Sequence, residues 1–129
     1  MDEIQMLNED QRWRENIGRE MKRGLLSVLL LWILRKNGEP MYGYEIIQTI
    51  AKTTKGQWIP KAGTIYPVLR RLESRGFVKS EWSSRTAGPS RRYYRITAAG
   101  KEAEEKILLE WKRHISGFRE FVRELLEGD

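Results

Sequence analysis

The sequence predicts a mainly α-helical fold of the α+β class, in which one short β-hairpin interrupts a series of helices. Three observations predict it. Apolar residues recur at the three- and four-residue spacing of helices over most of the 129 residues. Proline is absent from residues 1–36 and 97–129, so both ends of the chain can form long helices. Two short stretches between residues 77 and 96 are rich in aromatic and β-branched residues, which is typical of strands.

The first helix is predicted over residues 1–36, as one long helix or as two nearly continuous ones. Ile17, Met21 and Leu25 recur every four residues, and an almost uninterrupted apolar run follows up to Leu34. We therefore expect this helix to be amphipathic at first and buried later. The segment NGEP at residues 37–40 ends it, because Asn-Gly accepts a left-handed conformation and proline cannot continue the helix.

The second helix is short and is predicted over residues 42–54. Ile46, Ile47 and Ile50 lie on one of its faces, and Gly56 follows its end. The segment QWIP at residues 57–60 then connects it to the next helix.

The third helix is predicted to end at Gly76 and to begin close before Pro67, because proline breaks a helix interior. Thr64 is then its expected N-cap. Its apolar residues have the i, i+3, i+4, i+7 spacing of a buried helical stripe, and they are Ile65, Val68, Leu69 and Leu72.

The two strand-like stretches, FVKSEW at residues 77–82 and RRYYRI at residues 91–96, are predicted to form a β-hairpin around a loop that contains Gly88-Pro89. A last long helix follows from residue 97. Three helices, a hairpin and a long helix in this order describe a winged helix-turn-helix with long N-terminal and C-terminal dimerisation helices. We expect three parts: a helical extension (1–23), a winged helix-turn-helix DNA-binding domain (24–97) and a C-terminal dimerisation helix (98–129).

Positive charge is concentrated in one part of the chain. The whole chain has 24 Lys and Arg and 18 Asp and Glu, a net charge of +6. Residues 61–96 alone hold nine Lys and Arg against two Glu, a net charge of +7, whereas residues 1–23 sum to −1 and residues 97–129 to −2. Proteins that bind nucleic acid concentrate cations in this way, because neutralising phosphates releases condensed counterions. The third helix and the hairpin are therefore the predicted DNA-binding surface.

The residues of this surface have the types that a DNA-reading helix and wing require. A helix in the major groove needs small or polar residues near its N-terminus, and Arg70 faces away from the buried stripe, toward a base edge or a phosphate. The hairpin loop and the returning strand form a cationic tip for the adjacent groove or the backbone. Arg71, Arg75 and Lys79 are interpreted as a solvated face, and packing against the wing is an alternative for Tyr66. The candidate contacts are Lys61, Gly63, Thr64, Tyr66, Arg70, Arg85, Arg91 and Arg92.

An apolar seam runs along the predicted C-terminal helix, with steps of three and four residues as in a heptad repeat. It packs either on its own domain or on a second copy of the chain. A helix of about 28 residues is about 42 Å long, longer than a small domain needs, so we favour a homodimer. The N-terminal helix contributes through Ile17 and Met21, and two-fold symmetry sets two recognition helices about 34 Å apart. The seam residues are Leu108, Trp111, Ile115, Phe118, Val122 and Leu125.

Several classes of protein are excluded by composition. The chain has no Cys and a single His, His114, so we expect no metal site and no cofactor. The residues form no glycine-rich phosphate loop and no catalytic triad, so we expect no enzyme. The longest apolar run, residues 25–34, is too short to span a membrane, and the acidic N-terminus is no secretory signal. We therefore expect a soluble, cytoplasmic protein without a membrane partner.

Three motifs together resemble the PadR family of transcriptional regulators. They are YGYEI at residues 42–46, GTIYPVLRRLESRG at residues 63–76 with Trp82 following, and GPSRRYYRIT at residues 88–97 with Gly100. The resemblance covers about residues 24–100 and implies a winged helix-turn-helix repressor that dimerises through its C-terminal helix and is released from DNA by a small molecule. The single C-terminal helix is similar to that of the small subgroup. The resemblance implies that Tyr42 is a DNA neighbour, that Gly63, Thr64, Tyr66 and Pro67 start the recognition helix, and that Arg91 and Arg92 belong to the wing.

The resemblance also concerns Trp111. Its position is similar to that of a tryptophan that lines a flat drug-binding pore between subunits in multidrug-responsive members of the family. This implies a flat aromatic or cationic effector that stacks on Trp111, and a plain aromatic of the dimer core is the alternative. The stretch before Gly24 matches no motif of the family.

The leading hypothesis is a dimeric, sequence-specific repressor that binds a palindromic operator in double-stranded DNA and is released by a small-molecule effector. A non-specific architectural DNA binder is a second hypothesis, which the basic hairpin equally allows. A third is a winged-helix adaptor that binds protein and no DNA. The concentrated positive charge argues against the adaptor, because a protein-binding surface has no reason to gather nine cations.

Overall fold

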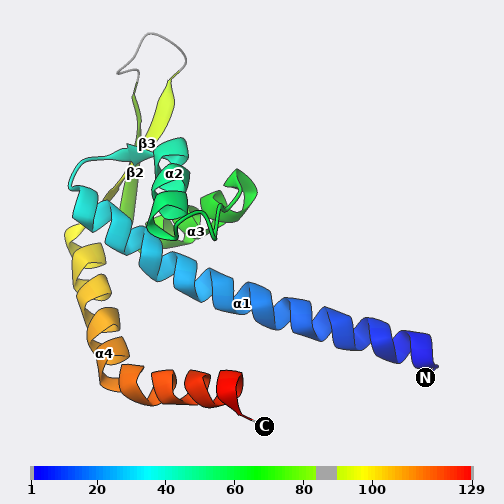
Figure 1. The fold of residues 1–129 in the computed structure, drawn as a ribbon. Helices are drawn as coiled ribbons and strands as arrows, with labels where there is room; N and C mark the ends of the chain where they lie inside the picture. Colours follow the sequence, from blue (N-terminus) through cyan, green and yellow to red (C-terminus); the bar gives the residue numbers. More distant parts are fainter. Residues whose placement is uncertain (1, 84–89, 129) are drawn as a thin grey trace.

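The computed structural model describes residues 2–83 and 90–128. The predicted fold class is confirmed: the chain is a mainly α-helical winged helix-turn-helix with long helices at both ends (Figure 1). The hairpin projects from the body at the end opposite to the C-terminal helix. The elements in chain order are α1 (Glu3–Asn37), β1 (Met41–Tyr42), α2 (Gly43–Thr53), α3 (Ala62–Ser74), β2 (Val78–Ser83), β3 (Arg91–Ile96) and α4 (Ala98–Glu127).

Helix α1 is one continuous helix of 35 residues. At its start the side chain of Asp2 accepts a hydrogen bond of 2.8 Å from the N–H of Gln5. At its end Gly38 has a φ of 77°, and its N–H donates to the carbonyl of Leu34 at 3.2 Å. Gly38 ends the helix because this left-handed conformation strains residues that have a Cβ atom. The helix is exposed in its first half and buried in its second, as expected.

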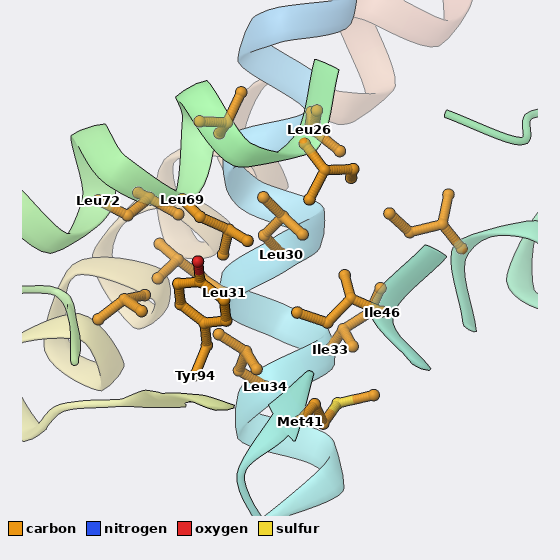
Figure 2. Packing of buried hydrophobic residues seen from close by; sticks show 14 residues of the cluster. Leu26, Leu30, Leu31, Ile33, Leu34, Met41, Ile46, Leu69, Leu72 and Tyr94 are labelled. Atoms are coloured by element: carbon orange, nitrogen blue, oxygen red, sulfur yellow. The ribbon is translucent and has the colours of Figure 1, made fainter. Parts of the chain in front are cut away.

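The core forms where the second half of α1 meets α2, α3 and the sheet (Figure 2). The apolar run of α1 supplies five of its fourteen buried residues, so this half of the helix lies inside the domain. Removal of these side chains from water is the main stabilising contribution. The buried cluster consists of Leu26, Leu30, Leu31, Ile33, Leu34, Met41, Ile46, Ile50, Ile65, Val68, Leu69, Leu72, Val78 and Tyr94.

Helix α3 begins earlier than predicted. Its N-cap is Lys61 and not Thr64, whose N–H already donates to the carbonyl of Lys61 at 2.9 Å. Pro67 therefore lies inside the helix. The N–H that proline lacks would have bonded the carbonyl of Gly63, and both residues are exposed, so water can bind that carbonyl instead.

The sheet has three antiparallel strands in the order β1-β3-β2. The predicted hairpin is confirmed, with a register that runs from Val78 opposite Ile96 to Ser83 opposite Arg91. Strand β1, in which Tyr42 pairs with Tyr93, was not predicted from the sequence. A two-residue strand is too short to show the alternation by which strands are recognised.

Helix α4 is anchored to the body at its first two turns. The side chain of Thr97 accepts a hydrogen bond of 3.0 Å from the N–H of Gly100 and donates one of 2.6 Å to the carbonyl of Gly76. One turn further, the fully buried carboxylate of Glu104 pairs with the guanidinium of Arg35 on α1, which raises the pKa of Arg35. The rest of α4 extends away from the core (Figure 1).

Candidate nucleic-acid interface

Helix α3 packs one face into the core and leaves the opposite face open. Ile65, Val68, Leu69 and Leu72 are buried, and the helical period of 3.6 residues turns the residues between them outward. We call this outward row the exposed ridge of α3. It consists of Gly63, Thr64, Tyr66, Pro67, Arg70 and Arg71.

The start of α2 packs against the exposed ridge. Tyr42 is the last residue of β1 and the N-cap of α2, and its N–H donates to the carboxylate of Glu45 at 3.2 Å. A Cβ atom at the next residue, Gly43, would lie 2.2 Å from the hydroxyl of Tyr66. The missing side chain of Gly43 therefore lets Tyr66 lie across the start of α2.

Two arginines of the wing, Arg91 and Arg92, lie beside the start of α2 and the exposed ridge of α3. The guanidinium of Arg91 lies 4.4 Å from the centre of the Tyr42 ring, a cation–π contact. Arg92 donates to the hydroxyl of Ser80 at 2.8 Å and lies 3.6 Å from the carboxylate of Glu73. Its guanidinium is also 5.9 Å from the ring of Trp82, its cross-strand neighbour. The strands thus hold both guanidinium groups beside α3.

These elements enclose an open groove of about 850 Å³, which we call the wing groove. Among the residues that the structure describes, no carboxylate lines it, and its aromatic rings and guanidinium groups suit a polyanion with flat bases. Tyr94, which also lines the groove, is 4% exposed, and burial raises the pKa of its hydroxyl. The lining residues are Tyr42, Gly43, Tyr44, Tyr66, Arg70, Trp82, Ser90, Arg91, Arg92 and Tyr94.

The structure brings together half of the residues that the sequence analysis selected for DNA contact. Gly63, Thr64 and Pro67 lie on the other side of the ridge, in a second groove between α3 and α1. Lys61 is exposed at the N-cap of α3 and lines neither groove. Arg85 lies outside the described residues. The selected residues that line the wing groove are Tyr42, Tyr66, Arg70, Arg91 and Arg92.

Sequence reasoning missed part of the lining. Trp82 is 68% exposed and Tyr44 is 62% exposed, which is unusual for large aromatic side chains. The hairpin register, which sets Trp82 opposite Arg92, was a signal for the first. The repeat of tyrosine on both sides of Gly43 was a signal for the second, and the rings of Tyr42 and Tyr44 stack at 6.4 Å.

The apolar residues that the sequence analysis assigned to a dimer interface are exposed or half-buried in the single chain. Ile17 and Met21 on α1 are 41% and 62% exposed. On α4, Trp111, Ile115, Phe118 and Leu125 are exposed, while Leu108 and Val122 are half-buried. The seam therefore does not pack on its own domain over most of its length.

Residues 2–83 and 90–128 contain no group of three or more His, Cys, Asp or Glu side chains that could hold a metal ion. Within the same residues, each helix is too short or too polar to cross a membrane.

The chain was compared with known families and structures. The model of the transcriptional regulator PadR-like family matches residues 30–106. An uncharacterized protein of Lysinibacillus sphaericus is 33% identical over 102 residues, which cover 79% of this chain and 87% of that protein. The crystal structure of a PadR family transcriptional regulator from Eggerthella lenta is 33% identical, with a TM-score of 0.67, and the match covers 96% of this chain and 99% of that one. A transcriptional regulator from Clostridium thermocellum has a TM-score of 0.69 at 31% identity, with 80% of this chain and 95% of that chain covered.

Proposed function

The chain belongs to the PadR-like family of transcriptional regulators and is a DNA-binding regulator of transcription, and from this premise we propose that it is a dimeric, sequence-specific repressor. The observation that carries the proposal is the wing groove. It joins the exposed ridge of α3 to two arginines of the wing, and its described lining contains no carboxylate. A regulator of this kind acts where its DNA lies, which we place in the cytoplasm.

In this proposal α3 enters the major groove of double-stranded DNA. Tyr66 and Arg70 extend from the exposed ridge into the wing groove, so they are the side chains assigned to base edges. Arg91 and Arg92 on the wing are assigned to phosphates or to the adjacent minor groove. Tyr42 contributes by holding the guanidinium of Arg91 on its ring.

The dimer is proposed to form through the exposed apolar rows of α1 and α4. A single chain rarely leaves so many large apolar side chains in water, and a second copy would cover them. A two-fold axis would repeat α3 about one turn of DNA away, so we expect the operator to be an inverted repeat.

A small-molecule effector is proposed to act at Trp111. This residue is 42% exposed on α4, where two protomers would bring their rings together and leave room for a flat aromatic or cationic molecule between them. If Trp111 instead fills the dimer core, planar ligands will leave its fluorescence unchanged.

Selection of bound duplexes from a random pool tests the proposed function. We expect enrichment of an inverted repeat whose half-sites are about 10 base pairs apart. Arg70→Ala should weaken discrimination at one position of each half-site by about 1–3 kcal/mol. Arg75→Ala is the matched control, because Arg75 follows the C-terminal end of α3 and lines neither groove. Binding without enrichment would support an architectural DNA binder instead, and absence of binding would support a protein-binding adaptor.

A further inference from the structure

A second groove borders the exposed ridge of α3 on the side away from the wing. It lies between α1 and α3 and has a volume of about 590 Å³. We call it the α1–α3 groove. Its lining residues are Arg19, Lys22, Arg23, Leu26, Gly63, Thr64, Pro67, Val68 and Arg71.

The periodicity of α1 places the cations of this groove on the face that turns toward α3. Residues 19, 22, 23 and 26 follow the i, i+3, i+4, i+7 spacing of one helical face. Leu26 is fully buried next to α3 (Figure 2), so the preceding residues of the same face point along α3. Ile17 and Met21 lie on the opposite side of α1, so a partner that covers them leaves the cations open.

The groove has a strongly positive lining. Its lining, as far as the structure describes it, contains four cations and no carboxylate. Arg19 has one partner, the carboxylate of Glu15, at 3.9 Å, which is a loose and exposed ion pair. In the part of the chain that the structure describes, Lys22, Arg23 and Arg71 form no ion pair. Their charges are therefore available to an anionic partner.

The position of the groove identifies the partner. Gly63, Thr64 and Pro67 belong both to its lining and to the exposed ridge of α3, so the groove continues the candidate DNA interface. When a helix lies in the major groove, one DNA backbone passes on each of its sides, and the wing accounts for one side only. We propose that the α1–α3 groove binds the phosphate backbone on the other side, through sequence-independent contacts from Arg19, Lys22, Arg23 and Arg71. This inference rests on the proposed function and adds the N-terminal half of α1 to the DNA-binding surface.

The double variant Lys22→Gln with Arg23→Gln tests the inference. Its matched control is Lys106→Gln with Arg113→Gln, two exposed cations of α4 away from both grooves. Binding of a selected duplex and of a random-sequence duplex is measured between about 50 and 200 mM salt, and circular dichroism melting checks folding. We expect the Lys22/Arg23 variant to bind both duplexes more weakly and with a slope of log K against log salt that is smaller by about 0.9 for each lost phosphate contact. The ratio of the two affinities should stay unchanged, because phosphate contacts carry no sequence information.

The outcomes separate this inference from the proposed function. A Lys22/Arg23 variant with the salt slope of its control overturns the inference, while loss of discrimination in Arg70→Ala still supports the proposed function. A Lys22/Arg23 variant that loses discrimination but keeps its salt slope also overturns the inference. Absence of DNA binding by the parent chain overturns both.

Discussion

Arg91 and Arg92 are adjacent in β3 and face the same groove, but their surroundings differ. Arg91 has a neutral aromatic partner, the ring of Tyr42, whereas Arg92 lies beside the carboxylate of Glu73. A nearby carboxylate offsets part of the attraction that a cation exerts on a phosphate. The two residues are therefore not equivalent as DNA contacts.

We predict that Arg91→Ala weakens DNA binding more than Arg92→Ala does. Loss of a charge-assisted contact costs about 1.5–3 kcal/mol, and the full charge of Arg91 is available to DNA. Arg92→Ala should instead lower stability slightly, because it removes the contacts to Ser80 and Glu73. Fluorescence anisotropy with a selected duplex measures binding, and urea unfolding measures stability. Equal affinities of the two variants would show that Glu73 does not weaken the contact of Arg92.

Two glycines, Gly43 and Gly100, allow a neighbouring part of the chain to pack closely against a helix start. The atoms that a side chain at these positions would meet differ in how far they can move. A Cβ atom at Gly100 would lie 2.1 Å from the backbone carbonyl of Phe77. A Cβ atom at Gly43 would lie 2.2 Å from the hydroxyl at the end of the Tyr66 side chain. Phe77 directly precedes β2, so its backbone carbonyl cannot shift without moving the start of that strand, whereas a tyrosine ring can rotate away.

We predict that Gly100→Ala lowers the free energy of unfolding by about 1–3 kcal/mol or more, because the start of α4 is forced away from the sheet. Gly43→Ala should cost less stability but displace Tyr66 from the wing groove and weaken DNA binding. Urea unfolding and fluorescence anisotropy on both variants check that Gly100→Ala mainly lowers stability and that Gly43→Ala mainly weakens DNA binding. The prediction fails if Gly43→Ala is the more destabilised of the two.

At the scale of the elements, the helices and the hairpin could be predicted from the sequence because each contains several periods of its pattern. Strand β1 could not, since Met41 and Tyr42 pair with β3 only through long-range contacts. The start of α3 was misplaced because the rule against proline inside a helix ignores where the unpaired carbonyl lies. Gly63 lies on the exposed side of the helix, where its carbonyl is open to water.

The candidate site could be predicted in part. Segment charges pointed to α3 and the wing, and five selected residues line the wing groove. The segment charges did not reveal the cations of α1. The net charge of residues 1–23 is −1, although Arg19, Lys22 and Arg23 share one helical face. The net charge counts all residues of a segment, whereas a binding partner contacts only the residues on one face of the helix. The division of the exposed ridge between two grooves also depends on the packing of α1 against α3, which no local pattern contains.

At the scale of the whole molecule, the exposed apolar residues of α4 support the proposed homodimer. The seam is apolar over about 26 Å, taking 1.5 Å per residue from Leu108 to Leu125. Most of the stability of a helix in a protein comes from the packing of its apolar face, and the proposed second copy would supply that packing here.

We predict that Ile115→Glu converts a dimer to a monomer, because it places a charge in the middle of the seam. Leu109→Glu is the matched control: Leu109 is 54% exposed on α4 but lies about 120° around the helix from Ile115, off the seam. Analytical ultracentrifugation of both variants measures the oligomeric state. If Ile115→Glu remains dimeric, α4 does not form the interface.

Helix α1 is one unbroken helix that carries three surfaces: the leucines of the core, the apolar residues proposed to meet a second copy, and the cations proposed to bind DNA. The positions of these three surfaces are therefore coupled. The regular rotation of the helix fixes the angles between these three surfaces around its axis. Each residue adds a rotation of about 100° around this axis. Insertion of one residue near Gly24, where an added Cβ atom would meet nothing within 4 Å, would leave the core half in place and turn the whole N-terminal half by that angle. The stripe proposed to meet a second copy and the cations proposed to bind a phosphate would rotate together, so a single inserted residue would change both surfaces at once.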